Sequence, residues 1–341
     1  MRRTTRGRPP AGPSTPCVAS RFGRALTLGV EEELVLVDPA TWAPAAAVEQ
    51  VLGPPGLKTE LFSCLVETNT PICETPQEAL EALVRLRRVA RERTQAVGLE
   101  LLASGSHPFG RGEEQPIVQE RRYLALLAER PSARRQLVCG LHVHVGMESL
   151  ERCLERLEAV LPWLPAVLAL SLNSPFLDGI ETGALSSRAA RLLELPRGGA
   201  PPRLHGGGWE RAVAEAGEPT KIWWDVRPHP KLGTLEVRMA DQQTDVRRSA
   251  GLTALVQALC VAAEPRLPLE REAYPGLRAA AAMGDAPTGE LLALVEPAAR
   301  ALGSWELVEG LREPPEAHRQ LELGRRDGFA ALVADLVARS A

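Results

Sequence analysis

Residues 221–241 read Lys221-Ile-Trp-Trp-Asp-Val-Arg-Pro-His-Pro-Lys-Leu-Gly-Thr-Leu-Glu-Val-Arg-Met-Ala-Asp241, two short β-prone runs on either side of a Pro/Gly turn. Side chains alternate between the two faces of a strand. Pairing across the turn would therefore pack together the apolar residues Ile222, Trp224, Val226, Leu235 and Val237. The opposite face would hold the charged residues Asp225, Arg227, Glu236 and Arg238. This hairpin predicts a surface that binds a polyanion and its metal ions.

Two further stretches carry charge within an apolar β pattern. Residues 26–38 are β-prone but contain three consecutive glutamates, of which Glu31 and Glu33 point one way and Glu32 the other. Buried carboxylates need a metal ion or a cationic partner. Residues 136–147 predict another strand, with His142 and His144 on one face and Leu141, Val143 and Val145 on the core face.

Each of these patterns has an ordinary explanation when taken alone. A His-x-His pair on a strand is often structural, and three glutamates in a row often form a solvated turn. Three charged strands far apart in the sequence are harder to explain as coincidence, because a charged sheet face needs neutralising groups. Together they predict one functional site.

The composition excludes several classes of protein. The chain has 341 residues, enough for one large domain or two smaller ones, with 40 basic and 43 acidic residues and a net charge of −3. That balance argues against a nucleic-acid partner. No uncharged apolar run is long enough for a transmembrane helix, so we expect a soluble protein without membrane contact. The six cysteines are scattered, which is typical of a reducing compartment, predicts a cytoplasmic location and makes a structural zinc site unexpected.

The pattern along the chain predicts an Arg/Pro-rich disordered tail over residues 1–22 and a single catalytic domain over 23–341. Residues 58–71 predict an extended segment bracketed by Glu60 and Glu67. Helical periodicity predicts helices over 75–97, 120–130, 150–172, 186–191, 249–263 and most of 264–341. A capping box at Thr75 opens the first of these helices, and prolines interrupt the third. No phosphate-binding loop of the Walker or G-x-G-x-x-G type is present.

Five motifs stand together in a familiar order: Gly29-Val-Glu-Glu-Glu33, Gly140-Leu-His-Val-His-Val-Gly146, Asn173-Ser-Pro-Phe176, Trp223-Trp-Asp-Val-Arg-Pro-His-Pro230 and Gly233-Thr-Leu-Glu-Val-Arg238. In these motifs the chain resembles the carboxylate-amine ligases of the glutamate-cysteine ligase type 2 family, which are relatives of glutamine synthetase by fold. The likeness covers about residues 26–263. It implies an α+β fold with a curved, mainly antiparallel sheet that forms an active-site funnel, with helices packed outside.

The resemblance also implies a reaction and its cofactors. ATP and Mg²⁺ would activate a small carboxylate, an amino acid such as glutamate, as an acyl phosphate, and an amine would displace the phosphate to form an amide. The implied metal ligands are Glu31, Glu33, Glu67, Glu236 and His144. The implied catalytic residues are Arg238, Arg227 and His144, and the implied nucleotide-binding residues are Arg238, Arg188 and His142.

Some features leave the product and the assembly open. Ser186-Ser-Arg188 is followed by Leu192 and Leu193, where the family often has an aromatic segment, so the acid and the amine are not fixed, and weak glutamate-cysteine ligase activity is one outcome. The alternatives are a small-molecule phosphotransferase on the same fold, a non-catalytic nucleotide- or metabolite-binding paralogue, and a metal-dependent hydrolase using His142 and His144. A homo-oligomer also remains open.

Overall fold

The computed structural model describes residues 21–195, 197–264 and 269–340. Its centre is a seven-stranded antiparallel sheet in the order β2-β3-β1-β5-β9-β8, with β4 paired to the far end of β1. The strands of this sheet are β1 (Leu28–Val37), β2 (Leu57–Thr59), β3 (Leu65–Asn69), β4 (Glu100–Leu102), β5 (Gly140–Gly146), β8 (Val226–His229) and β9 (Thr234–Asp241). A separate two-stranded ribbon joins β6 (Phe176–Leu177) and β7 (Ile180–Glu181).

Helices surround this sheet. The α-helices are α1 (Val48–Val51), α2 (Pro76–Gln95), α3 (Arg121–Glu129), α4 (Leu150–Val160), α5 (Leu164–Leu170), α6 (Ser187–Leu192), α7 (Gly208–Ala216), α8 (Val246–Ala262), α9 (Tyr274–Ala282), α10 (Thr288–Ala301), α11 (Trp305–Glu309) and α12 (Glu316–Arg339). The short 3₁₀ helices are η1 (Gly112–Glu114), η2 (Pro131–Arg135), η3 (Leu161–Trp163), η4 (Pro219–Lys221) and η5 (Gly310–Arg312).

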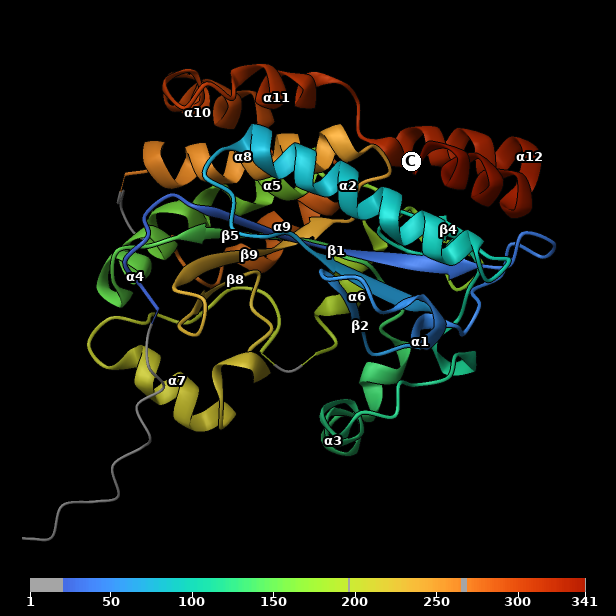
Figure 1. The fold of residues 1–341 in the computed structure, drawn as a ribbon. Helices are drawn as coiled ribbons and strands as arrows, with labels where there is room; N and C mark the ends of the chain where they lie inside the picture. Colours follow the sequence, from blue (N-terminus) through green and yellow to red (C-terminus); the bar gives the residue numbers. More distant parts are fainter. Residues whose placement is uncertain (1–20, 196, 265–268, 341) are drawn as a thin grey trace, which may run out of the picture.

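The two faces of the sheet have different surroundings. Figure 1 shows α2, α8, α10, α11 and α12 stacked on one side of the sheet, whereas α3 and α7 lie on the other side. Leu141, Val143 and Val145 of β5 join the apolar cluster that includes the buried residues of α8. Since β5 alternates, its histidines face the opposite side, toward α3 and α7. The sheet therefore separates an apolar core from a polar cleft.

The β8–β9 hairpin that the sequence predicts forms, but its first strand starts only at Val226, so Ile222, Trp224 and Asp225 lie before the strand. Val226 pairs with Val237 and Arg227 pairs with Glu236. The turn ends at Gly233, whose φ of +72° favours glycine. A Cβ at this position would lie 2.4 Å from the carbonyl oxygen of Arg21, because the segment that enters β1 crosses the hairpin there. The hairpin and this N-terminal segment therefore pack as one unit.

The fold class predicted from the sequence is confirmed: the fold is α+β with a mainly antiparallel sheet that does not close into a barrel. The Thr75 hydroxyl caps α2 by accepting from the Glu78 backbone N–H, and the helix predicted over 150–172 is split into α4, η3 and α5. The extended segment predicted over 58–71 is two strands, β2 and β3, joined by a turn. Helix α7 follows a Gly/Pro-rich loop and is not predicted by its sequence.

Two residues of the predicted tail, Arg21 and Phe22, lie in the described part of the chain. Residues 1–20 of the tail lie outside the described residues. Arg21 and Phe22, also assigned to the tail, belong to the folded part: Arg21 N–H donates to the Pro230 carbonyl, and Phe22 packs against the core. Among the described residues, no helix has the length and apolar character required to cross a bilayer. The assignment of 23–341 to one domain stays a prediction.

Candidate active site

Strand β1 sends its three glutamates to two faces, as alternation requires. Glu32 is buried behind the sheet, where Arg87 of α2 forms two charge-assisted hydrogen bonds with its carboxylate at 2.6 and 2.8 Å. Glu31 and Glu33 face the cleft on the other side. The backbone N–H of Gly140 donates to Glu33 Oε2 at 2.5 Å. Glu32 is therefore a structural group, and Glu31 and Glu33 are available to a ligand.

Strand β5 places its two histidines beside these carboxylates. Antiparallel pairing sets Glu31 opposite His142 and Gly29 opposite His144. His142 Nδ1 lies 3.2 Å from Glu31 Oε2, and His144 Nε2 lies 3.6 Å from Glu31 Oε1. His144 Nδ1 is held 2.9 Å from the hydroxyl oxygen of Thr234. Both imidazoles are buried; His142 lines the open cleft, and His144 lines a separate cavity at the start of β1.

Strand β9 contributes Glu236, which lies between two arginines. Arg227 Nε donates to Glu236 Oε2 at 2.6 Å, and Arg238 Nη1 donates to Oε1. Burial alone would raise the pKa of Glu236, but Arg227 and Arg238 hold it well below its usual range. Glu236 is therefore ionised, and both guanidiniums line the open cleft next to it.

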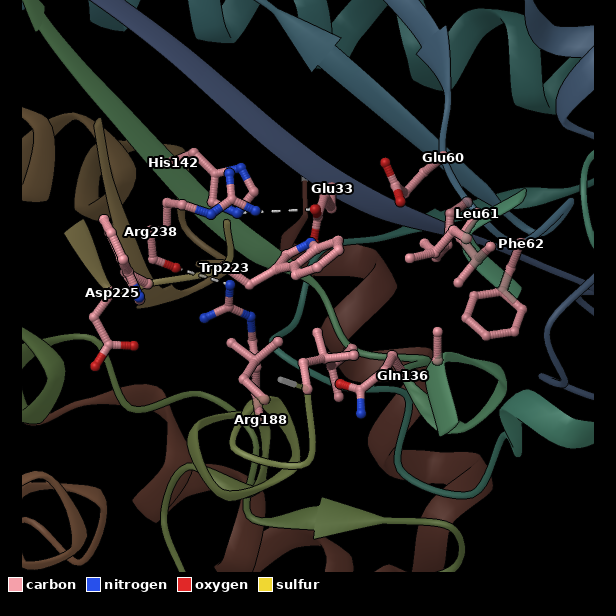
Figure 2. A pocket seen from close by; sticks show the side chains of 17 residues that line it. Glu33, Glu60, Leu61, Phe62, Gln136, His142, Arg188, Trp223, Asp225 and Arg238 are labelled. Carbon is pink, nitrogen blue, oxygen red and sulfur yellow. Dashed lines mark hydrogen bonds and ion pairs between the residues drawn. The ribbon is translucent and has the colours of Figure 1, made fainter. Parts of the chain in front are cut away.

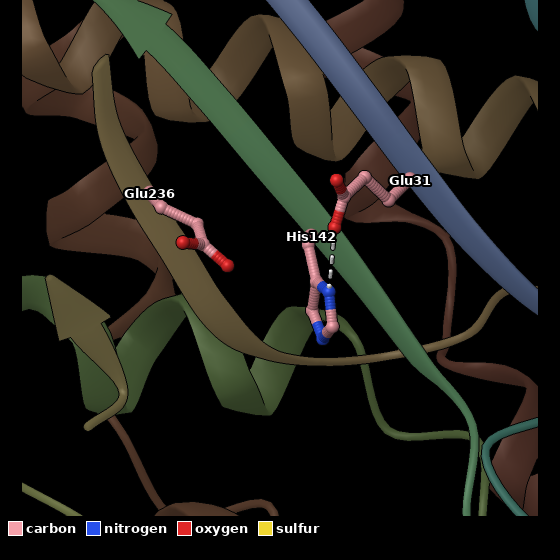
Figure 3. A group of neighbouring side chains, drawn as sticks. All are labelled: Glu31, His142 and Glu236. Atoms are coloured by element: carbon pink, nitrogen blue, oxygen red, sulfur yellow. Dashed lines mark hydrogen bonds and ion pairs between the residues drawn. The ribbon is translucent and has the colours of Figure 1, made fainter. Parts of the chain in front are cut away.

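Two groups of side chains have the donor sets of divalent-cation sites. In the first, Glu33, Glu60 and Glu67 bring carboxylate oxygens within 4.8 Å of one another. In the second, the two carboxylates of Glu31 and Glu236 and the imidazole of His142 each offer a ligand atom within the same 4.8 Å. Figure 3 shows these three side chains on neighbouring strands. The second group contains His142, whereas the sequence suggested His144 as the ligand. Glu60, which lies in the turn between β2 and β3, was not among the predicted site residues.

The first group carries negative charge that its surroundings do not balance. Burial and then the negative charge of Glu33 raise the pKa of Glu60 to about 7. Burial, followed by Glu31 and Glu60, raises the pKa of Glu67 well above its usual value. The cation closest to Glu67 among the described ion pairs is Lys58, at 3.9 Å. Clustered carboxylates of this kind fit Mg²⁺, a hard cation that prefers oxygen ligands.

Three cavities lie along the charged face of the sheet. An open cleft of about 670 Å³ is lined by the first of these metal-type groups, by Glu31 and His142 of the second, and by residues of α3 and η4. A smaller, more enclosed pocket of about 100 Å³ adjoins it and shares Glu33, Glu60, His142 and Arg238 with it (Figure 2). A third cavity of about 310 Å³ lies at the start of β1 and shares Glu31 with the open cleft.

The small pocket, which we call the acid pocket, contains a buried arginine without a carboxylate partner. Arg188 of α6 is 2% exposed, and its side chain donates only to the carbonyl oxygens of Arg238 and Met239, while its Nε–H has no partner among the described residues. The Gln136 amide oxygen, also buried, likewise lacks one. Figure 2 shows both side chains on the side of the pocket away from Glu33 and Glu60. An isolated buried cation and an isolated buried acceptor are costly unless a ligand pairs with them.

Asp225, which the sequence placed on the charged face, and the buried His107 both have structural roles. Asp225 does not join the charged face; it pairs with Arg278 of α9 at 2.8 Å and accepts from the Tyr274 hydroxyl. Asp225 directly precedes β8, so strand alternation does not govern its direction. His107, a loop histidine, lies 2.9 Å from the Trp42 carbonyl oxygen, and its other ring nitrogen accepts from Gly110 N–H.

Comparison with known proteins places the chain in a family. The model of glutamate-cysteine ligase family 2 matches residues 27–333. The chain belongs to glutamate-cysteine ligase family 2. A protein of Rubrobacter xylanophilus named "Putative glutamate--cysteine ligase 2-3" is 38% identical over 94% of this chain and 99% of its own length. A Herpetosiphon aurantiacus protein named "Putative glutamate--cysteine ligase 2" is 36% identical over 69% of this chain and 65% of its own.

Solved structures support the fold. A glutamate–cysteine ligase from Francisella tularensis in complex with AMP superposes with a TM-score of 0.73 at 13% identity, over 94% of this chain and 89% of that chain. A bifunctional glutathione synthetase from Pasteurella multocida gives a TM-score of 0.70 at 15% identity, over 93% of this chain and 52% of that one. The family resemblance read from the sequence is thus confirmed, and at the level of the family the protein is an ATP-dependent carboxylate-amine ligase.

Proposed function

We propose that this enzyme uses Mg·ATP to activate the distal carboxylate of an α-amino acid and joins that carboxylate to an amine. The observation that carries the proposal is the contrast among the buried carboxylates. Glu32 and Glu236 are neutralised by arginines, whereas Glu33, Glu60 and Glu67 converge with too little positive charge. A sheet that keeps such a group beside buried guanidiniums is suited to binding cations and anions together.

The donor sets indicate where Mg²⁺ would bind. Glu33, Glu60 and Glu67 would hold one ion, and Glu31, His142 and Glu236 a second. When bound, Mg²⁺ would neutralise phosphate and carboxylate charge and so allow the two anions to approach. His144, whose Nε2 is buried and 3.6 Å from Glu31, would orient that carboxylate.

The nucleotide would occupy the third cavity. Its walls combine apolar side chains with positive charge from Arg21, Arg24 and Lys58. It meets the open cleft at Glu31, so a triphosphate entering from this end would reach the metal-type groups. Arg238 and Arg227 lie beyond that point, where they would offset charge on the transferred phosphoryl group.

The acid pocket supports an α-amino acid as the substrate to be activated. The Arg188 guanidinium would pair with the α-carboxylate, and the Gln136 amide oxygen would accept from the α-ammonium group. The side chain of the amino acid would then point toward Glu33 and Glu60, which line the same pocket. L-Glutamate has its second carboxylate at the end of such a side chain.

The reaction itself would need no covalent enzyme intermediate. The substrate carboxylate attacks the γ-phosphorus of ATP, ADP leaves, and an amine then attacks the acyl phosphate and expels inorganic phosphate. The amine would enter through the open cleft, which is lined by Arg121, Arg122 and Lys221.

The buried cysteines near the site are poor candidates for a covalent nucleophile. Burial raises the pKa of the Cys64 thiol to about 12 and that of Cys139 well above its usual value, which keeps both thiols protonated and poorly nucleophilic.

The test is ADP release by the purified protein in Mg²⁺ with a panel of amino acids, with hydroxylamine present to trap an acyl phosphate as its hydroxamate. We expect L-glutamate or a close homologue to give ADP and hydroxamate in equal amounts. Glu33→Gln should remove both products, while Glu113→Gln, an exposed glutamate outside the cleft, should keep them. ADP without hydroxamate would indicate a phosphotransferase, and the absence of any acid-dependent ADP would reject a ligase.

A further inference from the structure

Strand β9 fixes the position of Arg188 through both its side chain and its backbone. At the side chain, Nη2 donates to the Arg238 carbonyl oxygen at 3.0 Å and Nη1 donates to that of Met239 at 3.1 Å. The guanidinium passes over Gly140, where an added Cβ would lie 2.2 Å from Nη2. The position of this cation therefore depends on close contacts with the backbone of two strands.

The backbone of Arg188 is tied to the same strand through Asp241. The fully buried Asp241 carboxylate accepts from the Ser186 hydroxyl at 2.8 Å, the Ser174 hydroxyl at 2.7 Å and the Asn173 N–H at 2.9 Å. None of the ion pairs found among the described residues includes it. Asp241 does not line the acid pocket or the open cleft.

The two serine hydroxyls connect Asp241 to helix α6. A hydroxyl group has one hydrogen, and each serine donates its hydrogen to Asp241. The free lone pairs of the two hydroxyl oxygens then accept from the helix: Ser174 Oγ from Arg188 N–H at 3.2 Å, and Ser186 Oγ from Ala189 N–H at 3.1 Å. Ser186 is the N-cap of α6. Asp241 thus orients both hydroxyls that fix the first turn of this helix.

We propose that Asp241 is a positioning residue for recognition of the acid substrate. It acts through Ser174 and Ser186 to set the first turn of α6, and so places the Arg188 guanidinium at the closed end of the acid pocket. This inference rests on the proposed function, because it gives Arg188 the role of binding the α-carboxylate. A displacement of about 1 Å in such a group is enough to weaken binding strongly.

The test begins with Asp241→Asn. An amide has one acceptor oxygen where the carboxylate has two, so its NH₂ group would face the donor of one serine. We expect the KM for L-glutamate in the hydroxamate assay to rise about tenfold or more, with kcat and the Mg²⁺ and ATP dependences within about twofold of wild type. Ser174→Ala, which removes one link and leaves the charge, should shift KM in the same direction by a smaller factor.

A matched control separates positioning from general destabilisation. Glu316 of α12 is a second buried carboxylate; unlike Asp241 it is held by two arginines, and it lines neither the acid pocket nor the open cleft. Glu316→Gln should lower the melting temperature but leave the KM for L-glutamate unchanged. If Glu316→Gln raises KM as much as Asp241→Asn does, the effect of Asp241 is only structural and the proposal fails.

A double-mutant cycle tests the route through Arg188. In an Arg188→Ala background, Asp241→Asn should cause no further loss of kcat/KM for L-glutamate; additive losses would overturn the proposal.

A crystal structure of Asp241→Asn tests the proposal independently of turnover. We expect the guanidinium to leave the carbonyls of Arg238 and Met239, and an unmoved Arg188 would contradict the inference. If wild type has no acid-dependent activity, the proposed function fails, while a displaced Arg188 in this crystal structure would still support positioning by Asp241.

Discussion

Glu60 gives the metal-free protein a distinctive dependence on pH. Its pKa is about 7 in the folded protein because of burial and the charge of Glu33, against 4.5 for an ordinary glutamate. Between these values the folded state binds more protons than the unfolded chain. The free energy of unfolding should therefore fall as the pH rises from about 4.5 to 7, by roughly 2 kcal/mol for this half-buried group.

Urea unfolding in EDTA at several pH values measures this loss. Glu60→Gln should remove most of it and make the metal-free protein more stable than wild type at pH 8. Added Mg²⁺ should stabilise wild type more at pH 8 than at pH 5.5, since binding requires the ionised carboxylates. If the metal-free wild type and Glu60→Gln instead gain the same stability between pH 5 and 7, the raised pKa of Glu60 is contradicted.

Removal of a charge from the Glu32–Arg87 ion pair behind the sheet should destabilise the protein, whereas removal of the Glu60 charge should stabilise it. Arg87→Met leaves the Glu32 carboxylate buried without its partner, and we expect a loss of about 3–5 kcal/mol in the free energy of unfolding. The double variant Glu32→Met/Arg87→Met replaces both charges by side chains of similar size and should recover part of that loss, since the Thr244 carbonyl and the Ser249 hydroxyl also lose a partner. Urea midpoints of the three proteins decide the matter, and a double variant no more stable than Arg87→Met would refute the explanation.

For single residues, the sequence predicts which face of a strand a side chain takes better than it predicts which residue that side chain contacts. The alternation of β1 and β5 correctly separates Glu32 from Glu31 and Glu33, because the period of a strand is a local property. The pairing of Glu31 with His142 depends on the register between strands more than 100 residues apart. Glu60 and Gln136 lie beside a turn and after a 3₁₀ helix, where no periodicity shows which way a side chain points.

Among the elements, the β8–β9 hairpin depends on Gly233 for both its turn and its contact with the N-terminal segment. Gly233→Ala would force alanine into a left-handed conformation and place its Cβ against the Arg21 carbonyl. We expect a loss of about 1–3 kcal/mol. The KM for ATP should also rise, because Arg21, Arg24 and Gly233 itself line the third cavity, where we propose that the nucleotide binds.

A second glycine provides the matched control. Gly183 also has a positive φ, +87°, but no atom lies within 4 Å of the position that an added Cβ would take. Gly183→Ala therefore tests the backbone cost alone and should leave the KM for ATP unchanged. Equal effects of the two substitutions on that KM would show that displacement of the N-terminal segment is not the cause.

Helices and strands could be predicted from the sequence where their periodic pattern is long or where charged residues interrupt an apolar β pattern. The 20-residue helix α2 has a capping box and regular apolar spacing, and the hairpin has a turn between two β-prone runs. Helix α7 has Gly207 as its N-cap and starts at Gly208 after a Gly/Pro-rich loop, so its nine residues carry too short a pattern to be recognised. Its helical state depends on tertiary contacts through the buried Trp209 and Ala212.

At the scale of the whole molecule, one face of the sheet packs against the core and the other face carries the candidate active site. The back face packs against α2 and α8 and includes the neutralised Glu32–Arg87 pair. The front face keeps the carboxylates and arginines that face three adjoining cavities. The sequence indicated this division, since each charged strand has an apolar side. It could not indicate how the cavities adjoin, because α3, α6 and the 218–224 segment meet there only in the folded chain.

The central claim is that the substrate carboxylate becomes an acyl phosphate. It is tested most directly with L-glutamate carrying ¹⁸O in its side-chain carboxylate, incubated with enzyme, Mg·ATP and hydroxylamine. Mass analysis of the released phosphate should find one ¹⁸O atom for each hydroxamate formed, because the bridging oxygen leaves with phosphorus. Hydroxamate and ADP formed with unlabelled phosphate would mean that the carboxylate is never phosphorylated, and would contradict the mechanism proposed for this site.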